Sequence, residues 1–150
     1  MKSAAIVVAS IALLASGLAR AADIHILASP AARTAMTAVA PRFEEQTGDH
    51  LVFEYQEDDL ADAAARDDRI DAVIAPVADM GVLARLYRIL PDTRRTLGRA
   101  APTKAAPQGP VLVIAALRGG EREEPARTFC AYLTLPETIV ALRRNGLSQP

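Results

Sequence analysis

The sequence has 150 residues, of which 51% are hydrophobic and 4% aromatic, and its formal net charge is −1. This length and apolar content suit one globular domain, and the near-neutral charge without a basic stripe argues against a nucleic-acid partner. The one cysteine, Cys130, excludes an internal disulfide, and its apolar neighbours indicate a buried side chain rather than a reactive thiol.

The first 21 residues have the pattern of a secretory signal peptide. Lys2 gives the positive start, residues 4–18 form an apolar run, and residues 19–21 read Ala-Arg-Ala, an A-x-A cleavage site. A membrane anchor is the alternative, but the run has about 15 residues and a spanning helix needs roughly 20. No later segment is long and apolar enough to span a bilayer. We therefore predict a periplasmic or otherwise exported protein, cut before Ala22, whose residues 22–150 can bury a core of their own.

Two elements are predicted directly after the cleavage site. Residues 23–28 (DIHILA) alternate and are rich in Ile and Leu, which predicts a strand. Pro30 then opens an amphipathic helix, since apolar residues recur at three- and four-residue steps after it. Pro41 predicts a kink or a restart late in this helix, and Gly48 is expected to end it.

The following segments continue the alternation of strand and helix. Residues 51–55 (LVFEY) predict a second strand, a short helix is expected around residues 60–66, and residues 70–75 (IDAVIA) predict a central third strand. Apolar residues at helical spacing between positions 82 and 90 predict another helix. This order is typical of a parallel α/β sheet with right-handed crossovers.

The composition changes in the last third of the chain. Residues 91–110 hold four prolines and two glycines with little apolar periodicity, which predicts a long loop. An apolar strand follows at residues 111–117 (VLVIAAL), and then a helix over residues 125–133. A last helix is predicted to begin at Pro136 and to end at Gly146.

Three stretches, in matching order, follow the pattern of one known family. The first has a strand, a small residue, a serine and a helix ending in F-x-x-x-T-G; the second is RIDAVIAPVADM (residues 69–80); the third is ARTFCAYLTLPETIVALRRNGL (residues 126–147). Together they resemble periplasmic solute-binding proteins of the molybdate-binding type. The matching positions are Phe43, Thr47, Gly48, Asp71, Ala72, Val73, Ala75, Ala78, Asp79, Ala126, Arg127, Phe129, Leu133, Pro136, Glu137 and Gly146.

This resemblance implies an α/β fold, a three-layer sandwich with a mostly parallel sheet, equivalent to a single lobe of a type II periplasmic-binding-protein fold. Family members resemble a two-lobed clamp with the ligand between the lobes. Their chain crosses from the first lobe to the second after the third or fourth helix and returns to the first lobe before its last strand. Only residues 91–110 lie between those points here, too few for a second lobe with its own core. We therefore expect one solute-binding-protein-like lobe over residues 22–150, closed by a proline-rich bypass at residues 91–110.

Ser29 stands between the first strand and the first helix, where the resemblance implies a ligand contact. Backbone N–H groups at a helix start carry partial positive charge, so an oxyanion such as molybdate, sulfate or phosphate can bind there. Serine is also a common helix N-cap, a role that needs no ligand. The candidate ligand-binding residues at the strand ends are Ser29, Pro30, Ala31, Gln56, Ala75 and Pro76.

The acidic segment after the second strand argues against an anion. Family members present a serine- and glycine-rich loop there, whereas this chain continues from Gln56 with Glu57, Asp58 and Asp59, whose carboxylates repel an oxyanion. Such acids also suit calcium or magnesium, but the D-x-D-x-D-G signature is absent and a solvated helix start explains them. Asp79, after the third strand, is expected to act as an N-cap. We predict no metal site and no cofactor.

No nucleophile elbow, zinc signature, P-loop or dinucleotide-binding motif appears, so an enzyme is not indicated. One hypothesis is an exported module that binds a small oxyanion for ABC-type uptake, with a transporter membrane component as partner. Its affinity would be weak, because a single lobe leaves the ligand open to water. The other is a non-catalytic periplasmic interaction protein that has lost the ligand site and binds a partner protein or a second copy as a homodimer. A shortened relative without activity is also compatible with the sequence.

Overall fold

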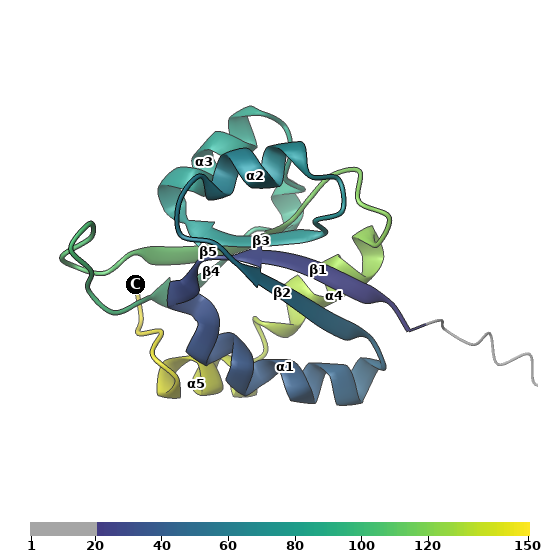
Figure 1. Ribbon diagram of the computed structural model, residues 1–150. Coiled ribbons are helices and arrows are strands. Elements are labelled where there is room, and N and C mark those ends of the chain that lie inside the picture. The colour runs from purple at the N-terminus through teal and green to yellow at the C-terminus, as the bar shows by residue number, and fades with distance from the viewer. Residues whose placement is uncertain (1–20) are drawn as a thin grey trace, which may run out of the picture.

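The computed structural model describes residues 21–150, and the predicted signal peptide, except for Ala21, lies outside the described residues. A five-stranded sheet forms the middle of three layers (Figure 1). Two helices, α2 (Leu60–Arg66) and α3 (Val77–Arg85), cover one face of the sheet. Three helices, α1 (Arg33–Thr47), α4 (Glu123–Tyr132) and α5 (Pro136–Arg144), cover the other. The predicted three-layer α/β architecture is confirmed.

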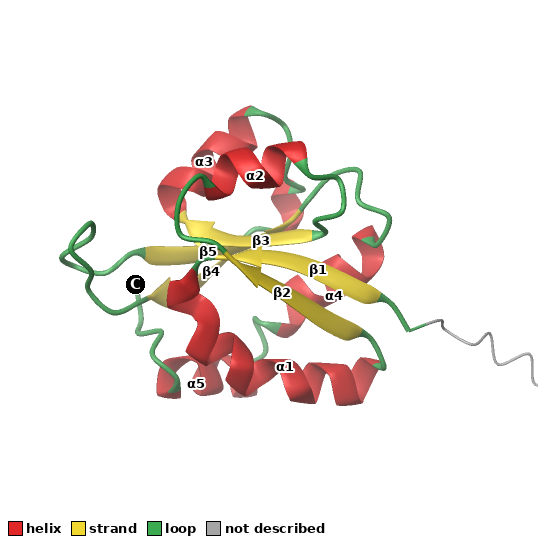
Figure 2. Ribbon diagram, in the orientation of Figure 1, coloured by secondary structure: helices red, strands yellow, loops and turns green. Residues whose placement is uncertain are grey.

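The sheet has the strand order β2-β1-β3-β5-β4 (Figure 2). β1 pairs in parallel with both β2 and β3, as the alternation of strand and helix predicts, and β5 runs antiparallel to both β3 and β4. The carboxyl ends of β1, β2 and β3 therefore meet at one edge. The strands are β1 (Asp23–Ala28), β2 (His50–Tyr55), β3 (Ala72–Pro76), β4 (Arg95–Arg99) and β5 (Val111–Ala116).

Each face of the sheet has its own buried core, because successive strand residues point to opposite sides. In β5, Leu112 and Ile114 face the layer of α1, α4 and α5, whereas Val113 faces α2 and α3. Aromatic rings dominate the first core, where the ring centroids of Phe43 and Phe129 are 5.0 Å apart. Cys130 lies in the same core, and its burial raises the pKa of the thiol to about 12. The prediction of a buried, unreactive cysteine agrees with this position.

α1 is one continuous helix. It follows a single 3-10 turn, η1 (Pro30–Ala32), and runs through Pro41, so the restart expected at that proline does not occur. Gly48 ends α1 with a φ of 76°, in the left-handed region that glycine adopts without strain.

Residues 91–110 are not the continuous loop that their composition predicts. Pro91–Thr93 form a 3-10 turn, η2, and β4 pairs with β5 along the sheet edge. The sequence of β4, RTLGR, has one large apolar residue between two arginines and so lacks the alternating pattern of a half-buried strand. The C-terminal segment covers this edge, since Arg99 and Ser148 exchange two backbone hydrogen bonds of 2.8 and 2.9 Å. Only residues 100–110 remain as the connection between β4 and β5.

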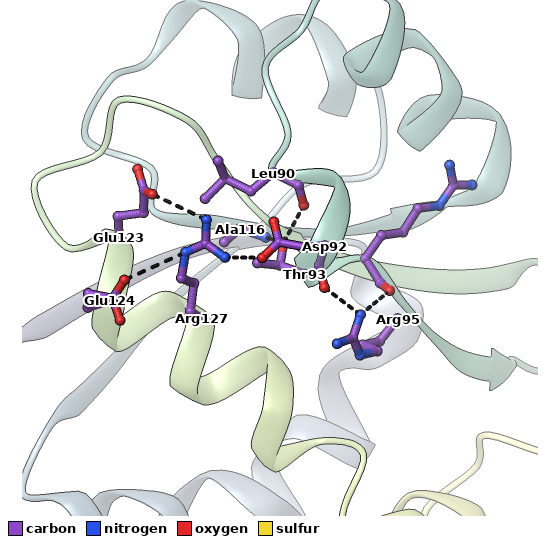
Figure 3. Close-up of polar contacts among 9 residues, drawn as sticks. Leu90, Asp92, Thr93, Arg95, Ala116, Glu123, Glu124 and Arg127 are labelled. Atoms are coloured by element: carbon purple, nitrogen blue, oxygen red, sulfur yellow. Dashed lines mark hydrogen bonds and ion pairs between the residues drawn. The ribbon is translucent and has the colours of Figure 1, made fainter.

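Polar contacts fix η2 to α4 and to β5 (Figure 3). The guanidinium of Arg127 contacts the carboxylate of Asp92 and two glutamates in the first turn of α4, and this pairing lowers the pKa of the Asp92 carboxyl. The buried Thr93 hydroxyl donates to the Leu90 carbonyl at 2.7 Å and accepts from the Ala116 amide at 2.9 Å. These contacts set the position from which β4 enters the sheet.

Candidate functional site

A cleft of about 520 Å³ lies at the carboxyl ends of the parallel strands, the usual place for a ligand in an α/β sheet. Four segments form its walls: the start of η1, the acidic turn after β2, the end of β3, and the connection between β4 and β5. The lining residues are Ser29, Pro30, Ala31, Glu57, Asp58, Pro76, Thr103, Ala105, Ala106 and Pro110.

Ser29 is the N-cap of η1, with φ −61° and ψ 137°. Its Oγ accepts a hydrogen bond from the Ala31 amide at 3.4 Å, a long and therefore weak bond. The other amides of this helix start are used, because the amides of Ala32 and Arg33 donate to the carbonyls of Ser29 and Pro30. The Ala31 N–H and the Ser29 hydroxyl are thus the donors that this corner of the cleft can offer a ligand.

The end of β3 brings a second helix start to the cleft. Pro76 has extended geometry, with φ −55° and ψ 151°, and α3 begins directly after it without a side-chain cap. Asp79 therefore lies in the first turn of α3 instead of at the expected N-cap, and burial raises the pKa of its carboxyl. Ala75 is fully buried in the core under α2 and α3, so the structure places it behind the cleft wall.

The turn after β2 gives the cleft an acidic rim. Gln56 does not line the cleft, and its side-chain amide donates to the Asp58 carbonyl at 2.5 Å. The neighbouring Glu57 and Asp58 do line it, and both are exposed. Arg33, the cation nearest in sequence to Ser29, lies over the Tyr55 ring at 4.4 Å from its centroid. The described lining of the cleft contains two carboxylates and no cationic side chain.

The connection between β4 and β5 supplies the wall that the sequence did not predict. Thr103 and Ala106 close a turn there, in which the Ala106 amide donates to the Thr103 hydroxyl oxygen at 3.0 Å. The composition of residues 91–110 gives no sign of this role. The family resemblance could have indicated it. In a two-lobed relative the second lobe would join the chain at this connection, and the ligand lies between the lobes, so the connection should start beside the cleft.

Two features of the described range, residues 21–150, bear on function. No group of three or more His, Cys, Asp or Glu side chains there is placed to hold a metal ion. No helix in that range is long and apolar enough to cross a membrane.

Solved substrate-binding proteins share this fold. The substrate-binding domain assigned to a molybdenum ABC transporter of Clostridium difficile matches with a TM-score of 0.75 and 8% identity, over 87% of this chain and 100% of that one. The periplasmic molybdate-binding protein of Azotobacter vinelandii matches with a TM-score of 0.71 and 10% identity, over 85% and 99%. Iron-bound HitA of Pseudomonas aeruginosa matches with a TM-score of 0.66 and 12% identity, over 83% and 85%.

No protein-family model matches the sequence, and no curated protein matches it significantly. Two of these neighbours are described as a substrate-binding domain and a molybdate-binding protein, and the third is iron-bound. One fold thus holds an oxyanion in one neighbour and a metal in another, so the residues of the cleft, and not the fold, determine the ligand. The chain has the α/β fold of substrate-binding proteins of the molybdate-binding type, in the form of a single lobe.

Proposed function

We propose that this chain is an exported single-lobe solute-binding module that binds a small oxyanion weakly and serves ABC-type uptake. The observation that carries the proposal is the pair of donors that the start of η1 presents at the cleft, next to the end of β3. The Ser29 hydroxyl and the Ala31 amide come from η1, and Pro76 leads into α3. The first-turn amides of a helix favour negative charge, and the fold is one that molybdate-binding proteins use.

Two features of the cleft predict weak binding. The carboxylates of Glu57 and Asp58 repel an anion, and no lining side chain offers a formal positive charge. A single lobe also leaves one side of the ligand in water, whereas tight sites bury most of the ligand surface. We expect a dissociation constant on the order of 1 mM, which corresponds to about 4 kcal/mol of binding free energy.

Calorimetry on residues 22–150 with molybdate, tungstate, sulfate and phosphate tests this function. We expect heat of binding for at least one anion, a several-fold loss of affinity in Ser29→Ala, and a gain in Glu57→Gln because that change removes one repelling charge. Thr128→Ala is the matched control, since its hydroxyl bonds a carbonyl of its own helix, α4, and does not line the cleft. Failure of all four anions to bind at about 10 mM, well above the expected constant, would contradict oxyanion binding.

A second candidate function is an interaction module whose cleft receives a partner protein. The acidic rim favours it, together with Val77, which is 46% exposed directly beside Pro76. Light scattering with chemical cross-linking separates the two functions. A stable complex that protects Glu57 and Val77 would favour the partner, whether that partner is another protein or a second copy. A monomer that binds an anion would favour solute binding.

A further inference from the structure

The start of the fold lies against the turn between α1 and β2. The backbone nitrogen of Ala22 is 3.0 Å from Oδ1 of Asp49, and the Ala22 carbonyl accepts a 2.8 Å hydrogen bond from the His50 amide. β1 begins with the next residue, where Asp23 pairs with His50. Ala22 is therefore held on both sides by the segment that leads into β2, at the end of the strands opposite the cleft.

Ala22 is also the residue that follows the A-x-A motif, so the same nitrogen takes part in the predicted processing step. Signal peptidase would hydrolyse the bond between Ala21 and Ala22 with one water molecule, leaving a carboxylate on Ala21 and an amine on Ala22. An α-amino group has a usual pKa of about 7.7 to 8.0 and is mostly protonated at neutral pH. The amide donor beside Asp49 would then become an ammonium group.

We propose that Asp49 is the binding site for the mature N-terminus, and that cleavage at Ala22 converts an amide–carboxylate hydrogen bond into an ion pair. The amide bond already has a charged acceptor, and cleavage adds a positive charge to the donor 3.0 Å from it, so the attraction between opposite charges strengthens the anchoring of β1. The inference rests on the export proposed above but not on any ligand, and failure of anion binding leaves it intact.

The turn holds Asp49 in position for this role. The Asp49 amide donates to the Thr47 hydroxyl oxygen at 3.2 Å, and the Thr47 hydroxyl donates to the Phe43 carbonyl at 2.8 Å. Gly48, in the left-handed region, turns the chain between them. Asp49 is half-buried, and its carboxylate already contacts the Ala22 nitrogen before cleavage. Binding the ammonium group therefore costs little additional side-chain entropy.

Carboxylates outnumber cations around Ala22. A hollow beside it is lined by Ala21, Asp23, Glu121 and Arg122, and the adjoining β2 edge carries a His50–Glu44 contact of 3.0 Å. Since most of these charges are negative, they favour the protonated amine together with Asp49. The titratable or charged groups around the new N-terminus are Asp49, which contacts it, and Asp23, Glu121 and Arg122, which line the hollow. His50, whose amide donates to the Ala22 carbonyl, and its partner Glu44 lie on the adjoining edge.

The first experiment identifies the cut. The full chain is expressed with export, and the mass and N-terminal sequence of the secreted product are measured. A product that begins at Ala22 supports the proposal. A product that begins at any other residue, or an uncut exported chain, overturns it.

The second experiment titrates the amine of a protein that begins at Ala22, labelled by ¹³C reductive methylation and followed by NMR. We expect a pKa above the usual value of about 7.7 to 8.0, which falls back in Asp49→Asn. Asp23→Asn is the matched control: it removes an exposed carboxylate one residue away that makes no hydrogen bond to the amine, so it should lower the pKa of the amine by less than Asp49→Asn does. Equal values in the parent and in Asp49→Asn would overturn the ion pair.

A third measurement covers the case in which Asp49→Asn does not fold. The protein that begins at Ala22 is compared with the same chain acetylated at its N-terminus, in which Asp49 is intact and the amine carries no charge. We expect a higher melting temperature for the free amine near pH 7, and convergence of the two as the pH rises through the pKa of the amine. Identical melting at all pH values would contradict the proposal.

Discussion

Asp71 is the buried residue through which the start of β3 is joined to β1 and β5. Its amide donates to the His25 carbonyl at 2.8 Å, its Oδ2 accepts from the His25 amide at 2.9 Å, and its carbonyl accepts from the Leu117 amide at 2.9 Å. The residue is 1% exposed, and Oδ1 has no hydrogen-bond partner within the described residues. A Cβ at Gly120 would lie 3.0 Å from Oδ1, so a larger residue there would press on the Asp71 carboxylate.

We predict that Asp71→Ala lowers the free energy of unfolding by about 1–3 kcal/mol, because it removes the acceptor of the part-buried His25 amide. Asp71→Asn should cost less, since its side-chain oxygen can still accept that bond and no charge is buried. Urea denaturation measures both, with Asp68→Ala as an exposed control expected within about 0.5 kcal/mol of the parent. An Asn variant as unstable as the Ala variant would disprove this account of Asp71.

At the same scale, the sequence could predict part of the cleft but not all of it. Ser29 follows β1 and Pro76 is the last residue of β3, and the carboxyl ends of parallel strands meet, so their proximity follows from strand order. The orientation of Ala75 could not be predicted, because β3 is buried on both faces and its side chains show no polar alternation. The direction of the Gln56 side chain depends on its hydrogen bond to the Asp58 carbonyl in the same turn, and hydrophobic periodicity carries no information about such a bond.

At the scale of elements, β4 shows why an edge strand is difficult to predict. It pairs with β5 across an eleven-residue connection and is covered by the C-terminal segment, which is distant in sequence, and its own residues are mostly polar. The pairing with β5 shifts register between Thr96 and Gly98. Gly98 has a φ of 145°, and a Cβ there would lie 2.5 Å from the Ser148 carbonyl oxygen. Gly98 contributed to the prediction of a loop, but the positive φ and the close approach of Ser148 mean that β4 needs a glycine at this position.

We predict that Gly98→Ala destabilises the protein by about 1–3 kcal/mol and exposes the Ser148 amide to hydrogen exchange, because the new methyl group displaces the C-terminal segment. Gly119→Ala is the matched control. Gly119 also has a positive φ, 83°, but a Cβ there has nothing within 4 Å, so this variant measures backbone strain alone. Equal losses in the two variants would show that the contact with Ser148 contributes nothing.

At the scale of the whole molecule, the lobe is held together by contacts between the two ends of the chain. β5 lies between β3 and β4, and α5 packs against α1 (Figure 1). The sequence predicts the alternating first half well, since each strand–helix unit has its own periodic pattern. The closure of the sheet by β4 and β5 depends on long-range pairing, which local patterns do not encode. The connection at residues 100–110 takes little part in either core and mainly forms a wall of the cleft.

Lys104, in the middle of this connection, is the only lysine of residues 22–150, and its neighbours on both sides are exposed. A lysine-specific protease should therefore cut the native protein once, with Lys104→Arg as the resistant control. We predict that the two fragments stay associated, with unchanged circular dichroism and elution volume, because β5 keeps its ladders with β3 and β4. Anion affinity should fall in the cut protein, since Thr103 and Ala106 no longer form a fixed wall. Dissociation of the fragments would show instead that the connection is needed for the lobe to hold together.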